Sequence, residues 1–472
     1  MSLEIAAARL LAPYLGSSVQ VWGALISVIL AAMALGYAIG GRIADRSTDD
    51  GPMFGAILAS GLYQAGTLFL AHPLLRRLAH WPDIEATLAA IVLLYALPIF
   101  LLACAAPCVI RLCAHTNVGA TAGLVSALGA IGSIGGVLLT SFVLLPQAGT
   151  RTTHQGLAAL SLILGAIGLL PRRAAVAGLA VLALPSAPER QWPAGTVWTA
   201  ESIYHVVQVV RLGSLHGLVL DQERSLHTAL DLKSGRAPGY WDDFAIGPPL
   251  ARGHRVLILG MGGGASVRAV RSADPEATID AVEIDPVVVR VAAEQFGIAP
   301  DPGLRIHLGD ARRFLAASSD RYDVIQMDLF RGGPEVPSHL ATREFYELAR
   351  RRLNPGGVLM MNVFDLAPGN PLLATITATL SHAFPTTFVR SHRQMNHMVI
   401  AFAEPRSLSE LRAALEAAPP PVSDIARDVS REVRPLSPDP AALVLTDDRA
   451  PVERLTRQMM EAARTAGLLP PR

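Results

Sequence analysis

A glycine-rich turn followed by a carboxylate is the clearest chemical signal in this chain of 472 residues. The apolar run Val256–Leu259 leads into Gly260-Met-Gly-Gly-Gly264, and a second apolar run ends at Glu283, roughly twenty residues further on. Glycines at such a turn let the backbone approach a bound nucleoside, and the carboxylate accepts hydrogen bonds from its ribose hydroxyls. We therefore predict a nucleoside site that includes Gly260, Gly262, Gly264 and Glu283.

Further acidic residues follow other predicted strands of the same region. Asp310 and Ala311 come after the third apolar run, Asp328 after the fourth, and Asn362 and Asp365 after the fifth. Ligands bind such sheets at the carboxyl ends of the strands, so we expect these carboxylates to converge on one rim. A single aspartate at a strand end is as often a helix cap, about half the time by its preference for that position.

These residues must be positioned by an α/β doubly wound sheet. Strands are predicted at 255–259, 278–283, 304–307, 322–328 and 356–363, with helices between them, and two more apolar runs at 386–391 and 397–402 predict an antiparallel edge. Alternating residues over about 196–232 predict a small antiparallel β unit. The soluble part is thus divided into a β unit at 196–250 and a Rossmann-like domain at 251–472, of the type that S-adenosylmethionine enzymes use. We read the proline-rich region 418–440 as a loop.

The first 185 residues are apolar and poor in charge, and they predict a transmembrane helical domain. Candidate spans are 18–40, 53–72, 86–108, 120–145 and 153–170. Residues 1–14 and 174–185 are short or interfacial, which gives five to seven helices. Small residues allow close helix packing, and we expect it at Gly123, Gly129, Gly132, Gly135 and Gly136.

Charge and cysteine content exclude several classes of function. The net charge of +1, without a basic cluster, gives no argument for nucleic acid. The three cysteines, Cys104, Cys108 and Cys113, lie on one apolar stretch without other nearby ligand types, so we predict no metal site. Arginines next to alternate spans favour an orientation with the soluble part in the cytoplasm, if 174–185 does not span.

From Glu201 to about Phe364 the sequence resembles the spermidine synthase (polyamine aminopropyltransferase) family. With the apolar helices in front, it is similar to the membrane-fused bacterial branch of that family. The matching stretches are Glu201-Ser-Ile-Tyr204, Leu218-Val-Leu-Asp221, the turn Gly260–Gly264, Val282-Glu-Ile-Asp285, Gly309-Asp310, Tyr322–Asp328, Leu353-Asn-Pro-Gly-Gly357 and Leu445–Glu453.

The resemblance implies roles for individual residues. Glu283 would bind the ribose, Asp310 and Ala311 would face the adenine, and Asp328 would be the base or would orient the attacking amine. On the substrate side it implies Tyr204 and Tyr240, together with Asp447 or Asp448 closing over the site, and we expect His205 and Arg331 at two further substrate-side positions.

Three positions depart from the family pattern. Gly263 stands where the family has an aspartate that contacts the terminal amine of decarboxylated S-adenosylmethionine, Arg331 replaces a second acidic residue, and His205 replaces a glutamine. Arg331 could pair with a carboxylate that the cosubstrate retains, or lie on a mobile loop facing water.

Three functions therefore remain open. The first, which we favour, is a membrane-anchored aminopropyltransferase that uses decarboxylated S-adenosylmethionine. The second is an S-adenosylmethionine-dependent methyltransferase acting on an amine or membrane-associated substrate. The third is a transporter or sensor with a polyamine- or nucleoside-binding domain. The expected partners are an amine or polyamine and the lipid bilayer, with a homodimer left open.

Overall fold

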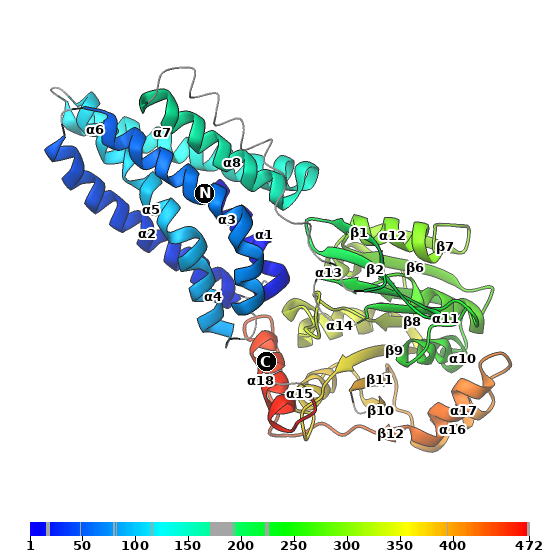
Figure 1. Ribbon diagram of the computed structural model, residues 1–472. Helices are drawn as coiled ribbons and strands as arrows, with labels where there is room; N and C mark the ends of the chain where they lie inside the picture. Colours follow the sequence, from blue (N-terminus) through cyan, green and yellow to red (C-terminus); the bar gives the residue numbers. More distant parts are fainter. Residues whose placement is uncertain are drawn as a thin grey trace. The chain divides into compact units, whose positions relative to one another are not determined.

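The computed structural model describes residues 1–15, 19–47, 49–78, 81, 83–114, 117–169, 192, 194–221, 226–393 and 395–469. The chain divides into two compact units, residues 1–192 and residues 193–471 (Figure 1). Each unit is described by itself below.

The first unit is helical throughout its described residues. Four of its helical runs are long and apolar enough to cross a bilayer: Gln20–Arg46, Gly51–Leu78, Ile84–Cys113 and Val118–Leu169. Its elements are α1 (Ser2–Leu15), α2 (Val19–Arg46), α3 (Gly51–Leu78), α4 (Asp83–Ile91), η1 (Val92–Ala96), α5 (Leu97–Ala103), α6 (Ala105–Cys113), α7 (Val118–Leu139), η2 (Thr140–Leu144) and α8 (Leu145–Leu169).

The two spans predicted at 120–145 and 153–170 lie in one helical run, Val118–Leu169. That run contains 52 residues, and at about 1.5 Å per residue this is enough for two crossings of a bilayer. It is broken at Gly149, whose φ of 75° and ψ of 170° are not helical. The helix α1 is shorter than a span, and the segment 174–185 lies outside the described residues.

Close helix packing occurs at other glycines than those predicted. A Cβ on Gly61 of α3 would lie 2.7 Å from the Leu162 nitrogen of α8, and one on Gly165 of α8 would lie 2.5 Å from the Leu58 nitrogen. Small residues thus bring α3 and α8 together. The prediction for α7 was wrong at four of its five glycines, because nothing lies within 4 Å of a Cβ built on Gly123, Gly129, Gly132 or Gly135.

The second unit begins with a small antiparallel sheet in the order β1-β2-β3-β4. Its inner faces pack on the larger domain through buried apolar residues such as Val207, Val209 and Leu218. The strands are β1 (Thr196–Glu201), β2 (Val206–Leu212), β3 (Leu215–Leu220) and β4 (Thr228–Asp231).

An eight-stranded sheet follows, in the order β12-β10-β11-β9-β8-β5-β6-β7. Strands β7, β6, β5, β8 and β9 are parallel, and β11 and β10 form the predicted antiparallel edge. The two-residue strand β12, which was not predicted, pairs with β10. The strands are β5 (Arg255–Leu259), β6 (Thr278–Glu283), β7 (Leu304–Leu308), β8 (Tyr322–Met327), β9 (Leu353–Phe364), β10 (Thr386–His392), β11 (Asn396–Phe402) and β12 (Arg434–Pro435).

Helices cover both faces of this sheet, because alternate side chains of each strand point into one of two apolar cores. In β5, Val256 and Ile258 join one core and Leu257 and Leu259 the other. The helices are η4 (Tyr240–Ile246), α10 (Gly247–Ala251), α11 (Ala265–Ala273), α12 (Pro286–Phe296), α13 (Ala311–Ala317), η5 (Ser338–Leu340), α14 (Arg343–Arg351), α15 (Pro371–Leu380), α16 (Leu408–Glu416), α17 (Ser423–Glu432) and α18 (Val452–Thr465).

The interpretation of 418–440 as a loop was wrong. The ten residues Ser423–Glu432 form helix α17, whose Ala426 and Val429 are fully buried in the core. The prolines lie on either side of this helix and do not interrupt it.

Candidate active site

The glycine turn joins the ends of three neighbouring strands. Gly260 has a φ of 83°, which suits glycine, and a Cβ there would lie 2.4 Å from the carbonyl oxygen of Asp328. Its N–H donates to the carbonyl of Val282 at 3.0 Å, and the N–H of Asp328 donates to the carbonyl of Leu259 at 3.0 Å. The turn after β5, the end of β6 and the end of β8 therefore meet at one place, where the strand order reverses.

The carboxylate of Glu283 is held by backbone amides. Its Oε2 accepts a hydrogen bond from the N–H of Gly262 at 3.0 Å, and its Oε1 accepts from Ile284 and Asp285 at 2.9 and 3.1 Å. Burial raises the pKa of Glu283, while these backbone donors oppose the rise. The predicted ribose-binding residue is thus fixed against the glycine turn.

The small β unit is attached to this rim by a serine. Ser202 donates to the carboxylate of Asp285 at 2.5 Å and accepts hydrogen bonds from the N–H groups of Tyr204 and His205. His205 is buried and lies 3.1 Å from Asp221. Of the two residues predicted on the substrate side here, His205 is thus inside the unit, and Tyr204 is exposed.

Asp328 lies at the end of β8 within a group of three side-chain donors. Tyr240 Oη donates to its carboxylate at 3.2 Å, and the indole Nε1 of Trp241 donates at 3.0 Å. Asn362, at the end of β9, donates from Nδ2 at 3.3 Å and also to Asn396 Oδ1 at 3.2 Å. The donors come from η4 and β9, far apart in sequence from Asp328.

The pKa of Asp328 is shifted upward, toward neutral pH. Burial raises the pKa of Asp328 to about 7, although the hydrogen bonds from Asn362, Trp241 and Tyr240 favour the charged form. A carboxyl group that titrates near the operating pH is suited to general acid–base catalysis. This group can therefore take a proton from a bound ammonium.

The place where an aspartate would project from position 263 is occupied. Gly263 donates its N–H to Thr228 Oγ1 at 2.8 Å, and a Cβ there would lie 2.9 Å from Thr228 Cγ2 and 3.2 Å from Phe296 Cδ2. The glycine therefore belongs with a close contact between the turn and β4. An aspartate here would require Thr228 to move.

Residues 248–395 match the spermine/spermidine synthase domain. A probable polyamine aminopropyl transferase of Bifidobacterium longum is 28% identical over 286 residues, which are 56% of this chain and 63% of that protein. The eEF1A lysine and N-terminal methyltransferase of Homo sapiens is 30% identical over 146 residues, covering 28% of this chain and 21% of its own length. The chain thus spans less than two thirds of these relatives.

Among solved structures, the crystal structure of a probable spermidine synthase from Corynebacterium glutamicum is 20% identical. The match covers 54% of this chain and 97% of that one, with a TM-score of 0.42.

Within the matched region, Asp310 caps the N-terminus of α13 and Ala311 is its first residue. Asp310 caps this helix by accepting a hydrogen bond from the Arg313 N–H at 2.9 Å, and its other oxygen lies 2.9 Å from His339 Nε2. The pKa of Asp310 is lowered, mainly by His339 and the Arg313 amide, which outweigh its burial. Asp310 is thus ionised at neutral pH, next to the buried Ala311.

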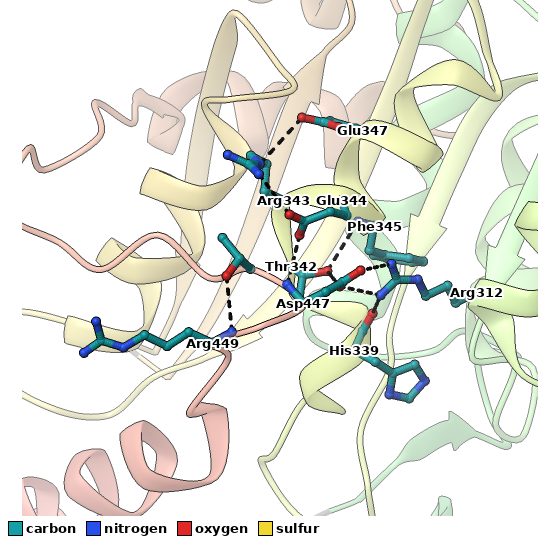
Figure 2. Close-up of polar contacts among 10 residues, drawn as sticks. Arg312, His339, Thr342, Arg343, Glu344, Phe345, Glu347, Asp447 and Arg449 are labelled. Carbon is teal, nitrogen blue, oxygen red and sulfur yellow. Dashed lines mark hydrogen bonds and ion pairs between the residues drawn. The ribbon is translucent and has the colours of Figure 1, made fainter.

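Asp447 extends the same cluster from the C-terminal segment (Figure 2). Its carboxylate accepts two hydrogen bonds from Arg312, at 2.7 and 2.5 Å, and one from Thr342 Oγ1 at 2.7 Å. Arg312 also donates to the carbonyl of His339 at 3.0 Å. Asp447 therefore ties the segment before α18 to α13 and α14, and both Asp447 and Asp448 are exposed. Their closing over a substrate stays a prediction.

Arg331 lies on the loop after Asp328 and has an acidic neighbour. Its Nη1 is 3.8 Å from Glu453 Oε1 of α18, and its N–H donates to the Glu335 carbonyl at 2.9 Å. Burial, followed by the proximity of Glu453, raises the pKa of Glu335 to about 7. The side chain of Arg331 is 42% exposed. Its pairing with a carboxylate of the cosubstrate stays a prediction.

Two of the carboxylates that follow predicted strands are structural caps. Asp285 is fully buried and accepts from the Val287 N–H, and Asp365 is fully buried and accepts from the N–H groups of Ala367, Leu372 and Leu373. Conversely, sequence reasoning missed Trp241 as a partner of Asp328 and gave Asn362 no role. The sequence features that could have indicated them are the position of Trp241 next to Tyr240 and the position of Asn362 near a strand end. In the described part of the chain, no cluster of three or more His, Cys, Asp or Glu side chains is placed to hold a metal ion.

Proposed function

We propose that this chain is a membrane-anchored aminopropyltransferase. It would transfer the aminopropyl group of decarboxylated S-adenosylmethionine to a polyamine-type amine. The observation that carries the proposal is Asp328, whose pKa is raised to about 7 beside the glycine turn and Glu283. The synthase-domain match over 248–395 supports the reaction class.

In this reaction an amine nitrogen attacks the propyl carbon bonded to the sulfonium. The C–N bond forms as the C–S bond breaks. The electron pair of the C–S bond stays on the sulfur and neutralises its positive charge, so the leaving group is 5′-methylthioadenosine. The amine must lose a proton, which Asp328 accepts. Tyr240 and Trp241 hold the carboxylate in one orientation, so the amine can be aligned with the reacting carbon.

Anchoring in the bacterial inner membrane is supported by the four apolar helical runs. Arg42, Arg46 and Arg111 lie near the C-terminal ends of alternate runs, which favours their side as the cytoplasm. The cosubstrate is made there, so we place the synthase domain in the cytoplasm. A reporter fused to the C-terminus should be active in the cytoplasm, and activity only in the periplasm would contradict this orientation.

The second candidate is methyl transfer from S-adenosylmethionine. Gly263, whose neighbouring space Thr228 and Phe296 occupy, leaves no carboxylate at 263 to bind a terminal ammonium. The similarity to the human methyltransferase also supports this candidate.

Products separate the two reactions. The purified full-length protein in detergent is incubated with an amine acceptor and either cosubstrate, and the nucleoside product is identified by mass spectrometry. We expect 5′-methylthioadenosine and an acceptor gaining an aminopropyl group. S-adenosylhomocysteine with a methylated acceptor would replace the first proposal by the second, and no transfer with either would contradict both.

A further inference from the structure

The buried aspartate of η4 is bound by two basic side chains of β10. Asp243 is 1% exposed, and its Oδ2 lies 2.7 Å from His392 Nε2. Its Oδ1 accepts a hydrogen bond from Arg390 Nη1. Since η4 is a 3₁₀ helix of seven residues, with weaker internal hydrogen bonds than an α-helix, contacts such as these fix its position. The same short helix carries Tyr240 and Trp241, the donors to Asp328.

The second route to Asp328 ends at the same place. In the antiparallel pair of β10 and β11, His392 lies opposite Asn396. Asn396 Oδ1 accepts a hydrogen bond from Asn362, which also donates to Asp328. The end of the β10–β11 hairpin therefore anchors both η4 and Asn362.

We propose that Asp243, Arg390 and His392 are positioning residues for the base. They hold η4 so that Tyr240 and Trp241 donate to Asp328, while Asn396 from the same hairpin orients Asn362. That these contacts serve catalysis rests on the proposed function, in which Asp328 takes the proton.

Two acidic residues next to the cluster have basic partners. Glu432 of α17 accepts from Arg390 Nε at 2.8 Å, and Asp242, the neighbour of Asp243, pairs with Arg236 at 2.9 Å. Removing His392 therefore leaves Asp243 paired with Arg390. His392 is thus the better position for substitution than Asp243, because losing the aspartate would leave Arg390 with only Glu432.

The sheet supplies a matched control on its opposite side. Asp280 of β6 is 3% exposed and is bound by Arg305 at 2.7 Å and His307 at 2.7 Å, both from β7. This cluster has the same three residue types and similar burial of the aspartate. Its further hydrogen bond comes from Tyr322, and none of these contacts leads to Asp328. Loss of His307 should reduce the stability of the folded domain without changing the pKa of Asp328.

The test is an infrared pH titration of the Asp328 carboxyl in the full-length protein, identified by its absence in Asp328→Asn. His392→Leu should raise the titration midpoint, because loosened η4 donors no longer stabilise the carboxylate. The expected change is about tenfold in the acid dissociation constant, equivalent to one hydrogen bond to a charged group. His392→Gln, which keeps an N–H donor for Asp243, should return the midpoint most of the way to the wild-type value.

His307→Leu is the control and should leave the midpoint unchanged. An unchanged or lowered midpoint in His392→Leu, or an equal rise in His307→Leu, would overturn the proposal. The titration requires no substrate, so it remains decisive if the wild-type protein transfers no group and the proposed function fails. Where transfer is observed, His392→Leu should lower kcat more than it changes KM for the nucleoside.

Discussion

The two halves of the candidate site are built in different ways. In the nucleoside half, Glu283 is held by three backbone amides of the glycine turn and of its own strand end. In the reactive half, Asp328 is held by the side chains of Tyr240, Trp241 and Asn362. Backbone donors fix a carboxylate whatever the neighbouring side chains are, whereas side-chain donors can be changed singly. The reactive half is therefore where this chain can be tuned to its reaction.

The largest effect separating the two halves should come from Asp328→Asn. The variant keeps the shape of the side chain but has no group that accepts the amine proton, so turnover should fall by about 10²–10⁴-fold. Steady-state transfer assays measure this loss. Asp424→Asn, a change of an 83% exposed carboxylate on α17, serves as the control. Turnover at the control's rate would show that Asp328 is not the base.

The next largest effect concerns the nucleoside half. Glu283→Gln should weaken binding of 5′-methylthioadenosine by about 10- to 100-fold, since charged hydrogen bonds to ribose are each worth about 1.5–3 kcal/mol. Calorimetric titration measures the dissociation constant, with the exposed Glu276→Gln as control. If both variants bound equally well, Glu283 would not contact the ribose.

The turn itself offers a packing test. Gly263→Ala should destabilise the Rossmann-like domain by about 1–3 kcal/mol through overpacking against Thr228. In a Thr228→Ser background, which keeps the hydroxyl bonded to the Gly263 N–H, the penalty should shrink by about 0.5 kcal/mol or more. Denaturant unfolding reports the free energies. Gly303→Ala, where a Cβ meets no atom closer than 3.5 Å, is the control, and strict additivity of the two changes would argue against the contact.

The smallest expected effect is a shift in pH dependence. Turnover requires ionised Asp328 and so declines as the pH falls through its pKa of about 7. Trp241 lowers that pKa by hydrogen bonding, so Trp241→Phe should move the acid limb of kcat upward by about one pH unit. Rate profiles over pH measure the limb, and Trp198→Phe in β1 is the control. A limb at the wild-type position in Trp241→Phe would separate Trp241 from the base.

The sequence located the glycine turn and Glu283 better than it located the donors to Asp328, for a physical reason. The glycine turn and Glu283 belong to one strand–turn–helix–strand unit, and their spacing is visible within about thirty residues. The donors to Asp328 come from η4 and β9, and only the folded sheet brings them together. The role of Asp365 as a buried cap could not be predicted either, because it depends on where α15 begins.

The fold followed the apolar patterns wherever these were long. The parallel strands and the antiparallel edge lie where the alternation and the apolar runs predicted them. Helix α17 was missed because its ten residues lie between prolines and contain only three apolar residues that pack on the core, Ile425, Ala426 and Val429. The glycines of α7 were misjudged because composition gives no information on which face of a helix meets a neighbour.

The central claim is that Asp328 is a buried base poised near neutrality. An infrared titration of the wild-type protein in detergent, taken as the difference from Asp328→Asn, measures it directly. We predict a carboxyl band that disappears with a midpoint near pH 7, as the raised pKa of about 7 requires. A midpoint near 4, the ordinary range for an exposed aspartate, would contradict the account.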